Sequence, residues 1–230
     1  MHCRPAVVPL LLVFLAATLG PGARAASTEA GAARWEKDIR AFETADQRNP
    51  PVPGGVVFYG SSSFRMWTNL AASFPAHRVV NRGFGGSQLS DLNQYFERVV
   101  PPHRPRLLLV YGGDNDIAGG KSAAQVEADF RTLVDLARRH CPETRVAFVA
   151  IKPSPSRLKY LAIQLEANTR IRRLASRYRR VDYLDAASPI LGADGQPDAR
   201  FFLADRLHLN GDGYRAWQAV LAPYLDRWAR

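Results

Sequence analysis

The stretch Val56-Val57-Phe58-Tyr59-Gly60-Ser61-Ser62-Ser63 runs from four apolar residues straight into a glycine and three serines. An apolar run that stops at small residues is typical of a buried strand that ends in a turn at the rim of a sheet. We interpret Ser62 as a candidate nucleophile at this rim. Taken alone, the stretch is also compatible with an ordinary turn or a helix N-cap, because glycine and serine are common in both.

Strands and helices are expected to alternate along the rest of the chain. Apolar runs predict strands at about 55–60, 78–82, 106–111, 145–151 and 181–185. Apolar residues at helical spacing predict helices near 34–46, 63–73, 89–99, 122–140, 157–178 and 211–228. Strands that are apolar throughout are covered on both faces. The sequence therefore predicts an α/β fold, a three-layer α/β/α sandwich around a parallel sheet, with functional residues beyond the carboxyl ends of the strands.

The N-terminal 25 residues have the features of a secretory signal peptide. Arg4 precedes an apolar run at 6–19, and Ala23-Arg24-Ala25 fits a small-x-small cleavage site. The run is shorter than the roughly 20 residues that a membrane-spanning helix needs, so we expect cleavage near Ala25 and no integral span in the mature chain. The expected organisation is a signal peptide at 1–25, a leader and N-terminal helix at 26–54, with a flexible leader at 27–33, and one domain at 55–230. We expect an exported protein, either periplasmic or secreted.

The chain is basic, with 31 Lys and Arg against 21 Asp and Glu and a net charge of +10. Loss of Arg4 and Arg24 with the signal peptide lowers this charge to +8. Much of the excess lies in the run 170–180, RIRRLASRYRR. A basic run can mark a nucleic-acid surface, but we favour a solvated helix face and expect no nucleic-acid partner in an exported protein. Weak attraction to an anionic envelope surface is the remaining hypothesis.

Polar or glycine-rich segments follow three further strands at the same predicted rim. They are Gly83-Phe84-Gly85-Gly86, Gly113-Asp114-Asn115-Asp116 and Lys152-Pro153-Ser154-Pro155. Glycines let backbone N–H groups approach an anion, and an asparagine amide can donate to a developing oxyanion. Each segment also has a purely structural interpretation as a tight turn, an Asx-turn or a rigid connector. We expect Phe84, Asp114 and Lys152 to contact a substrate.

A carboxylate and a histidine stand three residues apart in Asp205-Arg206-Leu207-His208, just before the last predicted helix. In a loop, such a carboxylate can hold one ring nitrogen while the other nitrogen faces outward as a base. The sequence has no HExxH motif and no ligand spacing among its Asp and His residues, so we expect neither a metal nor another cofactor. Without Cys3, Cys141 is the only cysteine, and no internal disulfide is expected.

Together these segments resemble, in order, the four blocks of the SGNH hydrolases, also called GDSL-type esterases and lipases. The matching residues are Ser62 within Gly60-Ser61-Ser62, Gly86, Asn115 within Gly113-Asp114-Asn115-Asp116, and His208 with Asp205. The resemblance implies a flavodoxin-like, five-stranded sheet of order 2-1-3-4-5. It implies Ser62, His208 and Asp205 as catalytic residues, and an oxyanion hole made by the N–H groups of Ser62 and Gly86 and the amide of Asn115. The family's first block usually has aspartate where this chain has Ser61, and alignment on the glycine favours Ser62 as the nucleophile.

The implied activity is hydrolysis of a small-molecule carboxylic ester. We favour short acyl groups, such as acetyl esters on a carbohydrate, because the sequence shows no obvious long hydrophobic lid segment. An acyltransferase that uses the same residues and a non-catalytic binding module on the same fold are the alternatives. The sequence makes no prediction of the oligomeric state.

Overall fold

The structure is a computed structural model that describes the backbone of residues 21–229 and the side chains from Arg34 on. The apolar run at 6–19 lies outside the described residues, so the signal peptide stays a prediction. Helix α1 (Pro21–Arg48) begins ahead of the segment 27–33, which we expected to be a flexible leader. Alanine recurs through this segment, and its high helix propensity accounts for the longer helix. In the part of the chain that the structure describes, no helix is both long and apolar enough to span a membrane.

Five parallel strands form one sheet in the order β2-β1-β3-β4-β5, which confirms the predicted fold class and strand order. The strands are β1 (Val56–Gly60), β2 (Val79–Gly83), β3 (Leu107–Tyr111), β4 (Arg145–Val149) and β5 (Val181–Leu184). In the register of the sheet, Gly60 aligns with Gly83 on one side and with Tyr111 on the other. The carboxyl ends of β1, β2 and β3 therefore meet at one place, where a parallel sheet of this order binds its ligands.

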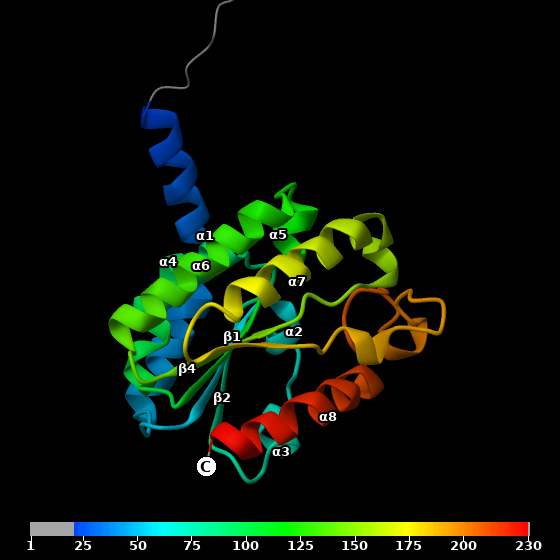
Figure 1. Cartoon of the computed structure of the whole chain (residues 1–230). Coiled ribbons are helices and arrows are strands. Elements are labelled where there is room, and N and C mark those ends of the chain that lie inside the picture. Colours follow the sequence, from blue (N-terminus) through cyan, green and yellow to red (C-terminus); the bar gives the residue numbers. More distant parts are fainter. Residues whose placement is uncertain (1–20, 230) are drawn as a thin grey trace, which may run out of the picture.

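Helices cover both faces of the sheet and make it a three-layer sandwich (Figure 1). On one face α4 (Leu89–Val99), α6 (Ala123–His140) and α7 (Leu161–Ala175) join α1 over side chains such as Val57 and Val110. On the other face α2 (Ser62–Arg65), α3 (Leu70–Ser73) and α8 (Gly211–Trp228) cover side chains such as Phe58 and Leu109. Side chains of a strand alternate between faces, so apolar strands bury both faces, as predicted. Short 3₁₀ segments complete the chain: η1 (Pro101–His103), η2 (Pro155–Tyr160), η3 (Ser188–Ile190) and η4 (Ala199–Phe201).

Beyond α1, three further helical segments differ from the prediction. The helix expected at 63–73 is divided into α2 and α3 around Trp67, which is buried, and the Asn81 amide donates to the Phe64 carbonyl at 2.6 Å. The same carbonyl also accepts from the Trp67 backbone N–H at 3.0 Å, so the chain leaves the helix here with this acceptor satisfied twice. The helix expected at 157–178 begins as η2 and continues as α7, which ends at Ala175. A short helix that was not predicted, α5 (Asp114–Ala118), follows β3.

The basic run 170–180 begins on α7 and continues into the turn after it. Arg170 pairs with Glu166 at 2.8 Å, and Arg172 pairs with Asp185 at 3.2 Å. Both arginine side chains are exposed, so this part of the run fits a solvated helix face whose charges are paired within the protein. At the end of α6, Cys141 is a free, buried cysteine, and burial raises the pKa of its thiol.

Candidate active site

Ser62 is the first residue of α2 and lies directly beyond the end of β1. Two glycines permit this position. A Cβ atom on Gly60 would lie 2.3 Å from the Tyr111 carbonyl oxygen, and one on Gly83 would lie 2.3 Å from the backbone nitrogen of Arg65. Without side chains at these positions, α2 can rest against the end of β2 while β1 stays close to β3.

The imidazole of His208 faces the Ser62 hydroxyl. His208 Nε2 lies 3.1 Å from Ser62 Oγ, and His208 Nδ1 lies 2.6 Å from Asp205 Oδ2. Because an ionised carboxylate only accepts hydrogen bonds, the proton of the neutral ring belongs on Nδ1. The lone pair of Nε2 then points toward the Ser62 hydroxyl. The structure thus brings together the three residues that the sequence predicts as catalytic.

The carboxylate of Asp205 also closes the turn that carries His208. Its Oδ1 accepts from the backbone N–H groups of Leu207 at 2.9 Å and His208 at 3.0 Å. Between them Arg206 has a φ of 57°, in the left-handed region. Partial burial raises the pKa of Asp205, but hydrogen bonds from the His208 ring and from these two N–H groups outweigh it and lower the pKa to about 2. Asp205 is therefore a carboxylate at neutral pH.

Helix α8 links the His208 turn to the Ser62 turn. Its N-cap, Asn210, accepts from the backbone N–H groups of Asp212 at 2.9 Å and Gly213 at 3.1 Å. One turn further on, the Tyr214 hydroxyl donates to the Ser63 carbonyl at 3.0 Å. The helix that starts just after His208 is therefore hydrogen-bonded to the residue next to Ser62.

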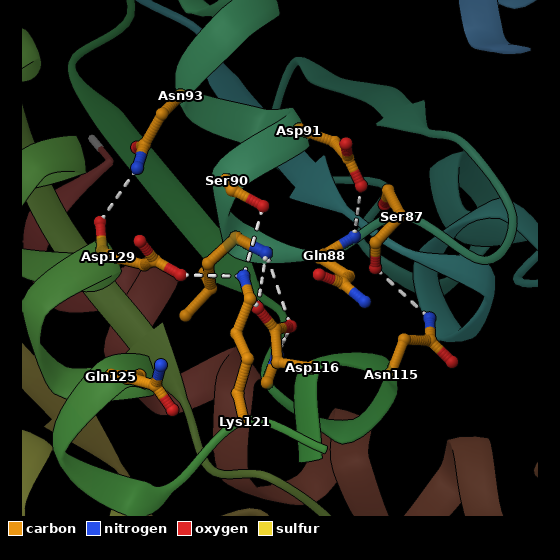
Figure 2. A network of polar contacts seen from close by, with 12 residues as sticks. Ser87, Gln88, Ser90, Asp91, Asn93, Asn115, Asp116, Lys121, Gln125 and Asp129 are labelled. Atoms are coloured by element: carbon orange, nitrogen blue, oxygen red, sulfur yellow. Dashed lines mark hydrogen bonds and ion pairs between the residues drawn. The ribbon is translucent and has the colours of Figure 1, made fainter. Parts of the chain in front are cut away.

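Three further donors lie at this rim. Within the described part of the chain, the backbone N–H groups of Ser62 and Gly86 have no hydrogen-bond acceptor. Gly86 has a φ of 80°, a conformation that glycine adopts without strain. Asn115, on α5, donates from Nδ2 to the Ser87 carbonyl at 3.0 Å, and Figure 2 shows its amide turned toward Ser87. The second N–H of this amide is left to bind another acceptor.

A buried carboxylate, Asp116, connects the segment after Ser87 with the segment that carries Asn115 (Figure 2). It accepts from the backbone N–H groups of Leu89 at 3.1 Å and Gly113 at 3.0 Å, and it pairs with Lys121 Nζ at 2.9 Å. Lys121 also pairs with Asp129 at 2.7 Å. Burial raises the pKa of Asp116, and the pairing with Lys121 opposes that rise. The network holds the start of α4, which follows Ser87, against the start of α5, which contains Asn115.

The three side chains expected to contact substrate lie inside the protein. Phe84 is fully buried and packs against the rings of Trp35 and Tyr59. Asp114 and Lys152 are 5% and 1% exposed, and their charged atoms lie 3.6 Å apart. The structure gives each of them partners within the protein, so direct contact with a substrate stays an untested prediction.

One polar residue next to the site, Arg157, was not predicted from the sequence. The guanidinium of Arg157, on η2, lies 2.8 Å from Asp114 Oδ1 and donates to Asn115 Oδ1 at 3.1 Å. In a chain with 31 Lys and Arg, no sequence signal distinguishes this arginine from its neighbours. Its position depends on the loop after β4 folding back over the rim.

The arrangement offers a hydroxyl, a base, a carboxylate and three N–H donors at an accessible edge of the sheet. The side chains of His208 and Asp205 are 21% and 45% exposed, so a solute can reach them. Among the residues that the structure describes, no three His, Cys, Asp or Glu side chains are grouped so that they could hold a metal ion.

Comparison with known proteins gives a consistent result. The model of the GDSL-like lipase/acylhydrolase family matches residues 44–216. No curated protein sequence matches the chain. Among solved structures, a GDSL-like lipase from Bacteroides thetaiotaomicron is 19% identical, with a TM-score of 0.71, over 82% of this chain and 97% of that one.

Two further solved structures are similar over about three quarters of the chain. A member of the lipolytic protein G-D-S-L family from Veillonella parvula is 20% identical, with a TM-score of 0.60, over 75% of this chain and 98% of that one. A carbohydrate esterase family 3 protein from Talaromyces cellulolyticus is 17% identical, with a TM-score of 0.55, over 76% of this chain and 97% of that one. At these identities the structural likeness establishes the shared fold.

Proposed function

The chain belongs to the GDSL-like lipase/acylhydrolase family, and we propose that it cleaves carboxylic esters with Ser62 as nucleophile, His208 as base and Asp205 as its partner. The observation that carries this proposal is the contact of 3.1 Å between Ser62 Oγ and His208 Nε2, with Asp205 at 2.6 Å from the other ring nitrogen. A hydroxyl is a weak nucleophile unless an adjacent base takes its proton, and this geometry supplies that base.

In the proposed first step, Ser62 Oγ attacks the ester carbonyl carbon while His208 Nε2 accepts the hydroxyl proton. The imidazolium that forms is stabilised by Asp205, which stays ionised because its pKa is about 2. His208 then gives the proton to the departing alcohol, and an acyl-Ser62 ester remains. In the second step His208 takes a proton from water and the resulting hydroxide attacks the acyl carbon; the acyl–Oγ bond then breaks, His208 returns the proton to Ser62 Oγ, and the carboxylic acid leaves.

The negative charge on the tetrahedral oxygen needs donors that are already in place. We assign this role to the backbone N–H groups of Ser62 and Gly86 and to the second N–H of Asn115. The support is that the two backbone groups lack acceptors within the described residues, and that Asn115 uses only one of its N–H groups on Ser87. Donors fixed in advance stabilise the transition state without reorganisation.

For the substrate we propose an ester with a short acyl group, such as an acetyl ester on a carbohydrate. The exposed edges of Asp205 and His208 leave room for a bulky alcohol portion outside the protein. The family name covers lipases and acylhydrolases, and one structural relative is a carbohydrate esterase. Both fit the hydrolysis of an acyl ester.

The test is hydrolysis of nitrophenyl acetate and of acetylated sugars by the purified protein, compared with nitrophenyl esters of longer acids. We expect Ser62→Ala to lose at least about 1000-fold in kcat and to lose labelling by a fluorophosphonate. Ser61→Ala and Ser63→Ala are the matched controls, because both neighbours are buried and neither side chain contacts His208. Wild-type turnover by Ser62→Ala with an inactive Ser61→Ala protein would refute the assignment. An acyl-sugar product formed when a sugar acceptor is added would instead indicate a transferase.

A further inference from the structure

The loop after β4 carries two cations that the proposed mechanism does not use. The Lys152 side chain is 1% exposed and the Arg157 side chain 18% exposed, and both pair with Asp114. Gln164, on α7, donates to the same carboxylate at 3.1 Å. Burial lowers the pKa of Lys152, and the nearby Asp114 charge opposes that effect. A buried group of three charges is costly unless its members are paired, so each partner constrains the others.

Arg157 fixes the orientation of the Asn115 amide. A guanidinium only donates hydrogen bonds, so the Asn115 atom 3.1 Å from Arg157 Nη2 must be the carbonyl oxygen Oδ1. A backbone carbonyl only accepts, so the atom 3.0 Å from the Ser87 carbonyl must be the amide nitrogen Nδ2. The two contacts exclude the flipped amide. The second N–H of Nδ2 therefore has one fixed direction, which is what an oxyanion donor requires.

Lys152 reaches the other half of the site. Its Nζ donates to the Leu207 carbonyl at 2.8 Å, and Leu207 directly precedes His208. From the same loop, the Ser156 N–H donates to the Arg206 carbonyl at 3.0 Å. These two bonds attach the loop after β4 to the backbone of the turn 205–208. The loop after β4 is thus bonded both to the Asn115 amide and to the turn that carries the base.

We propose that Arg157 and Lys152 are positioning residues for ester hydrolysis, joined through Asp114. Arg157 acts through Asn115 by aiming its free N–H at the oxyanion, and Lys152 acts through the backbone next to His208. This inference rests on the proposed function, because it assigns roles within the same site. Asp114 and Lys152 then support the reaction by holding other residues in place. Arg157 does the same and touches no reacting atom.

The test is a double-mutant cycle with Asn115→Ala, using kcat and KM for a short-chain nitrophenyl ester. Arg157→Lys keeps the charge beside Asp114, but its single ammonium group cannot reproduce the forked contact with two residues. We expect it to lower kcat about 10- to 100-fold with KM changed less than about threefold, since a whole oxyanion donor is worth about 100- to 1000-fold. In the Asn115→Ala background the same change should cost less than about threefold, because its target is gone.

Lys152→Met should behave differently, because Lys152 contacts the turn that carries His208 directly and reaches Asn115 only through Asp114 and Arg157. We expect a fall of about tenfold or more in kcat, most of which persists in the Asn115→Ala background. The control is Lys159→Gln, which removes an exposed positive charge from η2 and should keep wild-type kcat. Near-ultraviolet circular dichroism checks that each variant is folded, and Arg157→Gln repeats the cycle if Arg157→Lys fails this check.

Three results would overturn the inference. Arg157→Lys could lower kcat equally in both backgrounds, it could raise KM with kcat unchanged, as expected of a substrate-binding residue, or the positioning variants could keep wild-type kcat. Failure of the proposed function has a separate signature. In that case the wild-type protein and Lys159→Gln would themselves lack hydrolysis and fluorophosphonate labelling.

Discussion

Replacing Asp205 by asparagine separates two tasks that its carboxylate performs. Oδ1 accepts from the backbone N–H groups of Leu207 and His208, and the asparagine oxygen can keep both bonds. Oδ2 accepts from His208 Nδ1 at 2.6 Å, and in asparagine this position becomes a donor. To avoid two facing donors, the imidazole must move its proton to Nε2. The nitrogen that faces Ser62 then donates and cannot accept the hydroxyl proton.

The expected loss follows from this change of tautomer. Asp205→Asn should lower kcat about 1000- to 10,000-fold for a nitrophenyl ester, which corresponds to about 4 to 5.5 kcal/mol of transition-state stabilisation at 1.36 kcal/mol per tenfold change. Folding should be affected much less, because the two backbone hydrogen bonds that close the turn are kept. Asp205→Ala removes those bonds as well, so it should lose both activity and stability.

The assay is steady-state hydrolysis at pH 7.5 together with thermal unfolding of each variant. Asp198→Asn is the matched control: Asp198 caps η4 through the Arg200 N–H at 3.0 Å and pairs with the Arg200 side chain, without contact with His208. It loses the same charge from the same loop and should keep wild-type kcat. If folded Asp205→Asn retained more than about a tenth of wild-type activity, the tautomer argument would be wrong.

Two further predictions concern stability. The pKa of Asp205 is lowered to about 2 from an ordinary 3.8, so the stability that this ionised carboxylate contributes is complete above about pH 5 and is lost as the pH falls through 2. The difference in unfolding free energy between wild type and Asp205→Asn, measured with urea, should therefore shrink between pH 5 and pH 2, and a difference that grows on acidification would contradict the lowered pKa. Trp217 on α8 is fully buried against the rings of Tyr111 and Phe64, so Trp217→Ala should cost about 3–5 kcal/mol of unfolding free energy, whereas the half-buried Trp228→Ala should cost clearly less. Equal losses in the two tryptophan variants would mean that α8 is not packed as described.

The sequence predicts the position of a site residue where a chemically suitable side chain follows a strand that is recognisably buried. Strands apolar on both faces can only be buried, and the carboxyl ends of parallel strands share one edge, so Ser62, Asn115 and His208 could be assigned to that edge. The pair Asp205 and His208 was predictable because a spacing of three in a loop lets the carboxylate reach the ring. The strand order came from the family resemblance and was confirmed by the sheet.

The contacts that hold the site in place were not predictable. Helix α5 is a single short turn, too short for any periodicity to reveal it, and it begins after Gly113, whose φ of 100° no pattern announces. Arg157 and Lys152 have no local sequence partner, because Asp114 and Asn115 lie on another strand end. Phe84 follows a strand at the rim, yet the turn directs its ring into the core. Such pairings depend on loop paths, which residue types alone do not specify.

The separation of 146 positions between Ser62 and His208 has a consequence for how activity arises as the chain folds. Contacts between such distant segments form slowly, because closing a long loop costs chain entropy before the contact is gained. His208 lies directly before the last helix of the chain, and that helix is held by packing on the sheet and by hydrogen bonds such as the one from Tyr214 to the Ser63 carbonyl. During refolding, ester hydrolysis should therefore follow completion of the native state rather than formation of the sheet. Ester turnover and helix content can be followed together during refolding. Turnover that appears after the helix content is complete would show that activity reports the final folding step.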